Sequence, residues 1–223
     1  MATQKVRTAG SKDKVVILGS SGHAKCVMDV LEAMGSFEIV GLTTKDPVRA
    51  LGRYPVLGDD EVLPDLLSRG VTWAAVGVGG WVSNALRKQI YERVKSLGFQ
   101  VVTAVHPSAV ITGGVTIGEG SVIFAGVVLN PEVRIGENVV VATGSTVDHE
   151  TVVESHVLIS AGVSVGAKVT IREGALLAIG STITSGITVG KDALVGAGAV
   201  VVRDVPDGVR VYGIPARPVI PSI

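Results

Sequence analysis

Aliphatic residues recur at every sixth position through the second half of the chain, and this repeat constrains the fold more than any other feature. In the series that steps by six from Val105 to Val201, all seventeen positions are Val, Ile or Leu. The residue two positions earlier is small or β-branched throughout, from Ala109 to Ala199. Such hexads are typical of a parallel β-helix, in which three short strands make a coil of about 18 residues and each strand turns one aliphatic side chain inward. We therefore predict a left-handed parallel β-helix of roughly five to six coils over residues 105–206.

The phase of this repeat never slips, so no loop is expected to leave the coils. A smooth prism cannot enclose a deep pocket by itself, and any buried active site should then lie between two prisms. This predicts a closed homo-oligomer, with a homotrimer as the expected form. A solenoid that only supports other parts is the alternative, and the charged triplet Asp148-His149-Glu150 in mid-prism argues against it.

The first hundred residues follow a different pattern, in which buried-strand and helical stretches alternate. This alternation predicts a small, Rossmann-like parallel sheet with helices on its faces over residues 14–104. The change to strict hexads places the boundary near His106-Pro107. Residues 1–13 are expected to form a flexible tail, and residues 207–223 a C-terminal turn and tail. Strands are predicted at 14–18, 38–42 and 73–78, and helices at 24–34, 60–68 and 83–97.

Composition and charge exclude several classes of partner. Twenty Lys and Arg balance twenty Asp and Glu, so no basic surface is offered to nucleic acid or to an anionic membrane. Hydrophobic residues make up 47% of the chain, yet its longest runs of apolar residues and glycine span ten residues, whereas a bilayer span needs about 20. One cysteine, Cys26, excludes an intrachain disulfide and a cysteine-based metal cluster. Residues 1–13 lack the apolar segment of a signal peptide, so a cytoplasmic location is expected.

A glycine turn, Gly19-Ser20-Ser21-Gly22-His23, joins the first predicted strand to the first predicted helix. Free N–H groups and the helix dipole favour an anion such as a pyrophosphate at such a turn. The spacing is not GxGxxG, and Gly41-Leu42-Thr43-Thr44 stands where a dinucleotide enzyme carries an acidic residue for the ribose. A turn that only connects the two elements is the alternative.

His149 is the strongest candidate for a catalytic residue. It follows the inward Val147 on a corner where side chains leave the prism. A histidine can take a proton from an amine or hydroxyl nucleophile, and an adjacent carboxylate holds its tautomer and raises its basicity. A solvated polar corner is the alternative interpretation.

The other histidines and the cysteine receive simpler interpretations. His156 is expected at the surface, His106 in a structural role at the domain junction, and Cys26 in the core as a small residue of the first helix. His23 closes the glycine turn and is either structural or close to the ligand. Because the four histidines form no histidine-rich ligand set, and no serine or cysteine is proposed as a nucleophile, direct transfer without a metal or a covalent intermediate is expected.

Together these motifs resemble the bacterial nucleotide-sugar acyltransferases that include the sialic acid O-acetyltransferases and the bacillosamine and perosamine N-acetyltransferases. The resemblance covers residues 14–219 and is carried by GSSGHAK (19–25), HPSAVI (106–111), VDHETVV (147–153) and VGAGAVVVRDVPDGVRVYGIPARPV (195–219). It implies an acetyl-CoA-dependent transferase whose prisms trimerise. It also implies that CoA lies in the groove between neighbours and that the α/β domain holds a nucleotide-linked sugar.

The resemblance assigns roles to individual residues. It implies that His149 is the general base and that Glu150 raises its basicity. The acceptor-binding positions are Ser21, Gly22, His23, Thr43, Thr44 and Gly79. The CoA-contacting positions are Leu158, Ala167, Ile179, Ala197 and Arg217, the last within the turn expected to close the CoA end of the groove. No metal is implied.

Two positions depart from the family pattern. Leu158 stands where a second histidine often lies near the acetyl carbonyl, so a backbone N–H or His156 would have to polarise that carbonyl. Thr43 and Thr44 stand where an Asp pair often contacts the nucleotide base, which opens guanosine and thymidine nucleotides, or a free sugar, alongside uridine.

Three functions compete at this point. The leading hypothesis is acyl transfer from acetyl-CoA to an amino or hydroxyl group of a nucleotide-activated sugar. The second is O-acetylation of a free sugar acid such as sialic acid. The third is a trimeric scaffold that binds nucleotide sugars or CoA without turnover, which would have no need of the Asp148-His149-Glu150 triplet.

Overall fold

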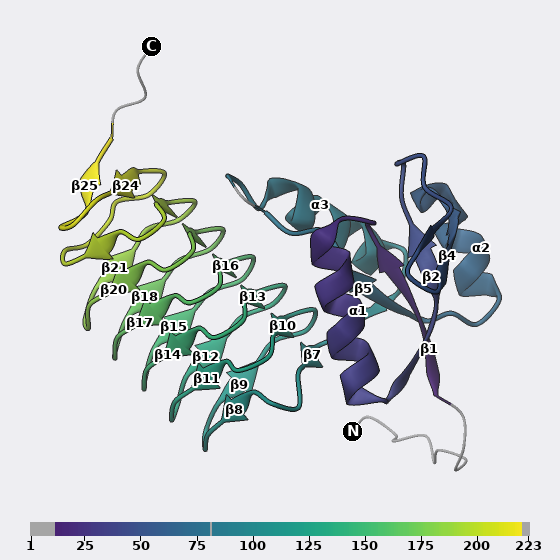
Figure 1. Ribbon diagram of the computed structural model, residues 1–223, viewed down its shortest axis with the longest axis horizontal. Coiled ribbons are helices and arrows are strands. Elements are labelled where there is room, and N and C mark those ends of the chain that lie inside the picture. Colours follow the sequence, from purple (N-terminus) through teal and green to yellow (C-terminus); the bar gives the residue numbers. More distant parts are fainter. Residues whose placement is uncertain (1–11, 81, 220–223) are drawn as a thin grey trace.

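The computed structural model describes residues 12–80 and 82–219, which form an α/β domain followed by a triangular β-prism (Figure 1). The α/β domain is built on a six-stranded sheet with the order β3-β4-β2-β1-β5-β6. Strand β1 pairs in parallel with β2 on one side and with β5 on the other, so the strand order reverses there. In such sheets ligands bind beyond the carboxyl ends of the strands at the reversal. The strands are β1 (Asp13–Leu18), β2 (Phe37–Thr43), β3 (Ala50–Leu51), β4 (Tyr54–Gly58), β5 (Trp73–Val76) and β6 (Gln100–Val101).

Helices cover both faces of this sheet because the side chains of β1 alternate between them. Val15 and Ile17 pack in one apolar cluster with α1 (Gly22–Met34). Val16 and Leu18 pack in another with α2 (Leu63–Ser68) and α3 (Ala85–Ser96), and the short 3-10 helix η1 (Asp60–Val62) precedes α2. Every strand and helix predicted in this part of the chain is present, whereas the short strands β3, β4 and β6 were not predicted.

The prism has three flat faces, each a sheet of parallel two-residue strands. Val122 pairs with Val140, and Val140 with Leu158, so one coil takes 18 residues. The domain face holds β7 (Ala104–Val105), β10 (Val122–Ile123), β13 (Val140–Val141), β16 (Leu158–Ile159), β19 (Leu176–Leu177) and β22 (Leu194–Val195). The second face holds β8 (Val110–Ile111), β11 (Val128–Leu129), β14 (Thr146–Val147), β17 (Ser164–Val165), β20 (Thr182–Ile183) and β23 (Val200–Val201). The third face holds β9 (Thr116–Ile117), β12 (Arg134–Ile135), β15 (Val152–Val153), β18 (Thr170–Ile171) and β21 (Thr188–Val189).

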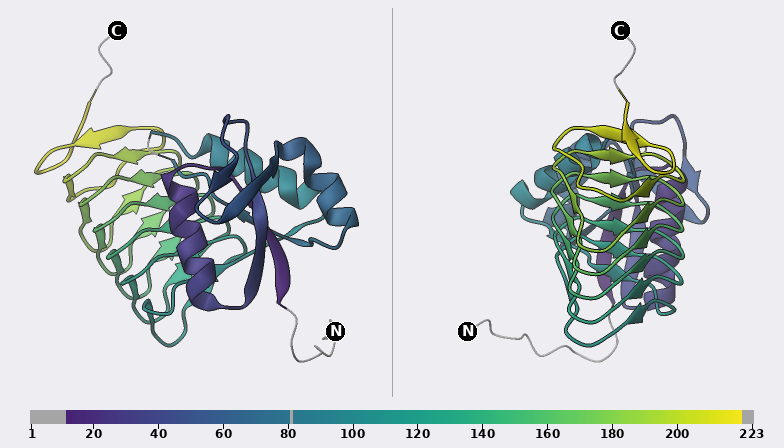
Figure 2. Two further views of the ribbon diagram at one scale, coloured as in Figure 1. Left: turned by 45° about the vertical axis from the view of Figure 1, so that its right-hand side comes forward. Right: turned by 90° about the vertical axis from the view of Figure 1, so that its left-hand side faces the viewer.

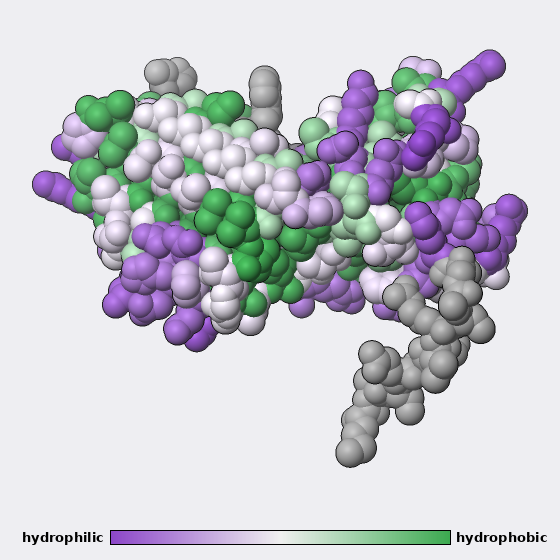
Figure 3. Space-filling model, turned by 60° about the horizontal axis from the view of Figure 1, so that its bottom comes forward, coloured by the Kyte–Doolittle hydropathy of each residue, from purple (hydrophilic) through white to green (hydrophobic). Residues whose placement is uncertain are grey.

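The inward aliphatic residues of the hexads form the core of the prism. From Ile123 to Val201 they are buried in one cluster. Ile111 remains 38% exposed in the first coil, because no earlier coil covers it. Figure 3, which brings this end of the molecule forward, shows hydrophobic residues gathered on the prism next to the α/β domain. The predicted fold class, an α/β domain followed by a hexapeptide-repeat β-helix, is confirmed.

The α/β domain lies against the domain face of the prism (Figure 2). Outward-pointing residues of that face are buried in the same cluster as residues of α1; they are Val122, Val140, Leu158, Leu176 and Leu194. We call the edge between the domain face and the second face the proximal vertex (turns at 124–127, 142–145, 160–163, 178–181 and 196–199). The edge between the second and third faces is the distal vertex (turns at 112–115, 130–133, 148–151, 166–169 and 184–187).

The C-terminal end of the prism closes with a shorter coil. Strand β24 (Arg210–Tyr212) pairs with β22 so that Arg210 lies beside Leu194, sixteen residues earlier in the chain. Strand β25 (Arg217–Pro218) then folds back antiparallel to β24. None of the helices in the described ranges is long and apolar enough to cross a membrane.

Candidate active site

His149 lies on the distal vertex, in the turn between β14 and β15. Its Nδ1 is 3.1 Å from Oε1 of Glu150, and both side chains are about half exposed. A carboxylate can only accept a hydrogen bond, so this contact places the ring proton on Nδ1. The lone pair of Nε2 is then free to accept a proton from solvent or from a ligand.

The neighbours of His149 hold this corner in place. The side-chain amide of Asn130 and the backbone N–H of His149 both donate to Oδ1 of Asp148, at 2.8 and 2.7 Å. These two hydrogen bonds lower the pKa of Asp148, and the one from Asn130 has the larger effect. Lys168, one coil further along, places its Nζ 3.5 Å from the other oxygen of Glu150. Glu150 itself has a φ of 58°, in the left-handed region that favours glycine.

The glycine turn offers unpaired N–H groups at the start of α1. Ser21 is the N-cap residue and its side chain makes no capping hydrogen bond, so the first N–H groups of the helix remain free to meet an anion. Ser21 and Gly22 are exposed. A Cβ added at Gly22 would meet no atom within 4 Å, which means that the space above the turn is open.

His23 turns away from this open space into the junction of the two domains. Its ring stacks edge-on against Phe124 with 5.5 Å between centroids, and its Nε2 is 3.4 Å from a guanidinium nitrogen of Arg87. A Cβ added at Gly79 would lie 3.1 Å from the His23 ring, so a larger residue there would have to push the ring by a few tenths of an ångström. Burial, and then the charge of Arg87, lower the pKa of His23 to about 3, and the ring is therefore neutral near pH 7.

Arg87 joins the α/β domain to the prism. Only 1% of this residue is exposed. Its guanidinium donates to the carbonyl oxygens of Val76 and Val78 at 2.9 Å each, and to that of Gly120 in the prism at 3.3 Å. Burial lowers the pKa of Arg87 to about 9. Its cation is thus held by backbone carbonyls from both domains.

A cavity of about 370 Å³ opens beyond the carboxyl ends of β1 and β2, where the strand order reverses. Thr43 is fully buried, and its hydroxyl donates to Oδ1 of Asp60 at 2.6 Å. The hydroxyl of Thr44 lies 2.9 Å from that of Ser20. Of the predicted acceptor residues, Thr43 and Thr44 line this cavity with Gly19, from which the glycine turn continues. His23 and Gly79 instead pack against each other at the domain junction.

The predicted CoA-contacting residues divide between two vertices. Ile179 is 61% exposed and Ala197 is also exposed, and both lie on the proximal vertex. Ala167 lies on the distal vertex, one coil beyond His149, and its N–H already donates to Oγ of Ser185 at 3.1 Å. Arg217 lines a cleft of about 170 Å³ with Arg203 at the C-terminal end of the prism. The structure thus places three of the predicted residues on two edges of the prism and Arg217 at its C-terminal end.

Leu158 is not placed where a CoA contact requires it. It points outward from the domain face and is only 5% exposed, packed in the cluster that includes α1 residues. Because the domain face is opposite the distal vertex, Leu158 and His149 of one chain do not meet. The expectation that Leu158 contacts CoA is therefore not supported within one chain.

Two of the simpler sequence interpretations are wrong. His156 is half-buried rather than a free surface residue: it lies edge-on to Tyr91 of α3, 5.7 Å between centroids, and its Nδ1 is 3.0 Å from Asn138 Nδ2. Burial and then the charge of Lys88 lower the pKa of His156. Cys26 is exposed rather than in the core. His106 is structural as expected, with Nδ1 2.7 Å from Oγ of Ser108.

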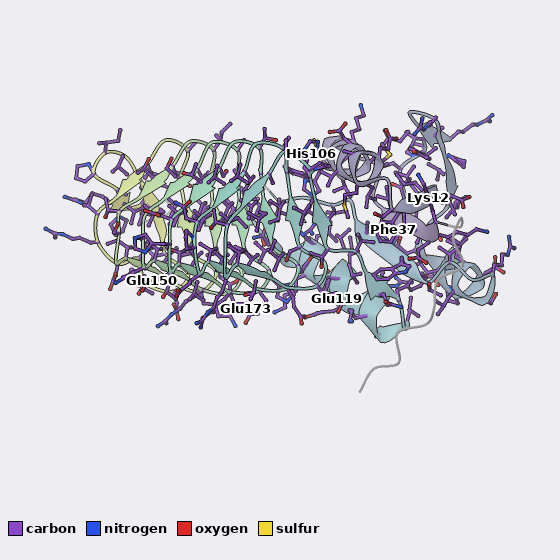
Figure 4. The ribbon with its side chains drawn as sticks, turned by 90° about the horizontal axis from the view of Figure 1, so that it is seen from below. Lys12, Phe37, His106, Glu119, Glu150 and Glu173 are labelled. Carbon is purple, nitrogen blue, oxygen red and sulfur yellow. The ribbon has the colours of Figure 1, made fainter. Side chains whose placement is uncertain are left out.

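Within one chain the glycine turn and His149 lie on different sides of the prism. The α/β domain covers the domain face, whereas His149 is on the opposite, distal vertex. Figure 4 shows Glu150 on an edge of the prism well away from the α/β domain, where Phe37 is found. The acceptor turn and the candidate base can therefore meet only if a second chain supplies one of them.

Sequence reasoning missed three residues of this arrangement: Arg87, Asp60 and Lys168. Arg87 is one of several basic residues on α3, and only docking of α3 on the prism distinguishes it. Asp60 had a usable signal, because the pair Asp59-Asp60 directly follows a strand, but β4 was not predicted. Lys168 is eighteen residues after Glu150, so the coil length alone places the two side by side.

The sequences of both domains match known protein families. Residues 14–94 match the PglD N-terminal domain, residues 114–149 the bacterial transferase hexapeptide (six repeats), and residues 168–203 the hexapeptide repeat of succinyl-transferase. UDP-N-acetylbacillosamine N-acetyltransferase of Bacillus subtilis is 31% identical over 114 residues, which is 50% of this chain and 51% of that protein. The match thus spans about half the length of that relative.

Two solved structures match nearly end to end. PerB from Caulobacter crescentus, in complex with CoA and GDP-perosamine, is 37% identical with a TM-score of 0.88, covering 96% of this chain and 99% of that one. The acetyltransferase domain of PglB from Neisseria gonorrhoeae, in complex with acetyl coenzyme A, is 32% identical with a TM-score of 0.87, covering 94% and 100%. The chain therefore belongs to the family of bacterial sugar acetyltransferases that join a PglD-type N-terminal domain to a hexapeptide-repeat prism.

Proposed function

We propose that this protein transfers the acetyl group of acetyl-CoA to the amino group of a nucleotide-activated sugar, with His149 as the general base. The relatives support both substrates: one is named a UDP-N-acetylbacillosamine N-acetyltransferase, PerB is in complex with CoA and GDP-perosamine, and the PglB domain is in complex with acetyl coenzyme A. The observation that carries the proposal is the exposed His149 ring whose Nδ1 faces Glu150 at 3.1 Å. Because Nδ1 is engaged with Glu150, Nε2 is the nitrogen that remains available to take a proton from the amine.

The reaction needs only one proton acceptor from the protein. The amine attacks the thioester carbonyl while Nε2 of His149 takes its proton, and a tetrahedral intermediate forms with the charge on the former carbonyl oxygen. The intermediate collapses by breaking the carbon–sulfur bond, and the imidazolium returns the proton to the CoA thiolate. Leu158 offers no donor to the oxyanion, so a backbone N–H must stabilise it.

The active site is formed between two chains. The glycine turn lies beside the proximal vertex of its own prism, since Lys25 and Cys26 of α1 line a cleft with Ala125 and Thr143 of that vertex. His149 and Ala167 lie on the distal vertex. If the second faces of three prisms are turned towards a common axis, each proximal vertex meets a neighbour's distal vertex. CoA then lies between Ile179 and Ala197 of one chain and Ala167 of the next.

The second face has the chemistry that such an assembly requires. Its outward residues are uncharged in every coil: Val110, Val128, Thr146, Ser164, Thr182 and Val200. The backbone N–H of Ile179 and both backbone groups of Ala197 have no partner within the described parts of the chain, so they remain free for an amide-rich ligand such as CoA. Arg203, Arg210 and Arg217 are the cations of the last coil and tail that can meet CoA phosphates.

Product chemistry tests the reaction. The purified chain should release CoA from acetyl-CoA in the presence of nucleotide-linked amino sugars, and the acetylated product should resist mild alkaline hydroxylamine, which cleaves esters but not amides. Acetylation only of hydroxyl groups on free sugars would replace the proposal with the O-acetyltransferase alternative. Ligand binding without any turnover would leave the scaffold alternative.

Mixing two inactive variants tests the shared site. His149→Ala removes the base, and Gly22→Val fills the space above the acceptor turn. If each site takes its turn from one chain and its base from another, half of the turns and half of the bases are intact in a 1:1 mixture. Random heterotrimers should then recover about one quarter of wild-type activity. If the two groups act within a single chain, no activity returns.

A further inference from the structure

We infer that the nucleotide of the acceptor carries guanine and that the carboxylate of Asp60 recognises it. This inference rests on the proposed function, since it names the base of the sugar nucleotide. Its site is the cavity of about 370 Å³ beyond the carboxyl ends of β1 and β2. Cavities of this size are within the range that binds small ligands.

The cavity lies where the base of the acceptor nucleotide must reach. Gly19 lines it and is also the first residue of the glycine turn, so a nucleotide with its phosphates over Gly22 has its nucleoside directed into the cavity. Leu86 and Ile90 of α3 form an apolar wall there, and Leu86 is 58% exposed. A flat aromatic base can cover this wall and remove it from water.

Asp60 presents a fixed carboxylate to the cavity. Its Oδ1 accepts the hydroxyl of Thr43 at 2.6 Å, and Thr43 is fully buried at the end of β2. The guanidinium of Arg93, which also lines the cavity, is paired with the Glu61 carboxylate at 2.8 Å and reaches only the backbone carbonyl of Asp60, at 3.5 Å. Across the described ranges no Lys, Arg or His lies within ion-pair distance of the Asp60 carboxylate. The group is therefore held by a neutral donor and keeps acceptor capacity for a ligand.

The pattern of donors on each base decides which one fits. An ionised carboxylate only accepts, and it can accept two parallel N–H bonds. Guanine carries two adjacent donors, N1–H and the N2 amino group, on one edge. Uracil and thymine carry a single N–H flanked by two carbonyl oxygens, which a carboxylate repels, and adenine carries one amino group beside a ring acceptor. Asp60 therefore selects guanine.

Gln89 supplies a second polar group for the base. It lines the cavity, and its side-chain amide makes no hydrogen bond within the described residues. The O6 atom of guanine is an acceptor next to N1–H, and the Gln89 amide can donate to it. The apolar wall, the carboxylate and this amide together match one base.

Binding of free nucleotides to the full-length chain tests the inference. Calorimetric titration with GDP, UDP, dTDP and ADP should show GDP binding about 10–100-fold more tightly than the others, which is the discrimination expected from one bidentate pair. Asp60→Asn keeps the shape and still accepts from Thr43, but replaces one acceptor oxygen with an NH₂ donor. This variant should lose most of the preference for GDP and gain affinity for XDP, because xanthine has a carbonyl where guanine has the N2 amino group.

The controls separate this inference from the proposed function. Asp65→Asn, on α2 and paired with Arg69 outside the cavity, should leave all four affinities unchanged, and matching melting temperatures show that both variants fold. Preference of the wild type for UDP or dTDP, or an unchanged GDP preference in Asp60→Asn, overturns the role of Asp60 while acetyl transfer stands. If no nucleoside diphosphate binds and no nucleotide sugar is acetylated, both proposals fail.

Discussion

Replacing Glu150 by glycine separates the effect of its carboxylate on kcat from the effect of its strained backbone conformation on stability. Glu150 occupies a corner with a φ of 58°, and Gly114 and Gly186 occupy the same corner two coils away with φ of 77° and 74°. An L-residue in this region costs about 1–2 kcal/mol. Glycine removes that cost but adds about 0.5–1 kcal/mol through the flexibility of the unfolded chain. Taking the middle of each range, the net backbone gain from Glu150→Gly is about 0.8 kcal/mol.

The side-chain contacts of Glu150 offset part of this gain. Its carboxylate is 3.1 Å from His149 Nδ1 and 3.5 Å from Lys168 Nζ, and it is 47% exposed. Exposed pairs of this kind contribute about 0–1 kcal/mol. Glu150→Gly should thus change the free energy of unfolding by less than about 1 kcal/mol in either direction. The kcat should nevertheless fall, though by less than the ~10²–10⁴-fold expected for loss of the base itself.

Glu132→Gly is the matched control. Glu132 lies on the same vertex one coil earlier with a φ of 63°, and within the described ranges its side chain makes no ion pair. This variant should be more stable by about 0.5–1 kcal/mol and should keep full activity. Melting temperatures at equal subunit concentration and steady-state rates with acetyl-CoA test both variants. If both variants lose kcat equally, the loss comes from a more flexible corner and not from the missing carboxylate. If kcat is unchanged in Glu150→Gly, the carboxylate has no part in the mechanism.

Three further predictions follow from the site. Gly22→Ala should fold normally but raise the acceptor KM by about 10–150-fold, because it should cost one charge-assisted hydrogen bond to the acceptor. Gly113 is another exposed glycine with open space around it, and Gly113→Ala should leave the KM unchanged. His149→Ala should lower kcat by about 10²–10⁴-fold with little change in acetyl-CoA affinity, and a wild-type rate would refute the base assignment. Burial, together with the charge of Arg87, holds the pKa of His23 at about 3 in the folded chain, against 6.5 for an ordinary histidine. The unfolded chain therefore takes up the proton first, and the free energy of unfolding should fall as the pH drops from 6.5 towards 3, by at most about 1.4 kcal/mol per pH unit. His23→Gln keeps an acceptor for Arg87, and in denaturation curves it should make the free energy of unfolding less dependent on pH in this range. An equally steep dependence in the variant would show that other titrating groups cause it.

The prism could be predicted from the sequence because its information is local. Each inward aliphatic position, from Ile123 to Val201, is buried by the coil in which it occurs and by the coils beside it. The same repeat places His149 on a corner, since it follows the inward Val147 by two residues. The parallel sheet of the first domain was also predictable, because its strands are separated by helices of ordinary length.

The burial of individual side chains was harder to predict, because it depends on how the two domains pack. His156 is polar and lies on a turn, so its sequence indicates a surface, yet α3 covers it. Leu158 looks like any outward strand residue and is buried by the α/β domain. Cys26 is on α1, the helix that packs against the prism, but its side chain lines a cleft at the edge of that interface and stays exposed. No pattern within either domain carries this information.

The constant coil length also fixes how the two halves of the active site are arranged. Positions eighteen residues apart lie above one another on the same vertex. One line along the distal vertex is therefore formed by four residues: His149, Ala167, Ser185 and Arg203. At about 4.8 Å per coil, the base and Arg203 are roughly 15 Å apart along the axis. An extended CoA can therefore follow this line, with its thioester near His149 and its phosphates near the last coil. The α/β domain covers the opposite face of the same prism, so no change within one chain brings the acceptor to this line. In the proposed assembly a neighbouring prism brings the acceptor there. The unbroken repeat that prevents a pocket within one chain also supplies a straight edge along which two chains can form one.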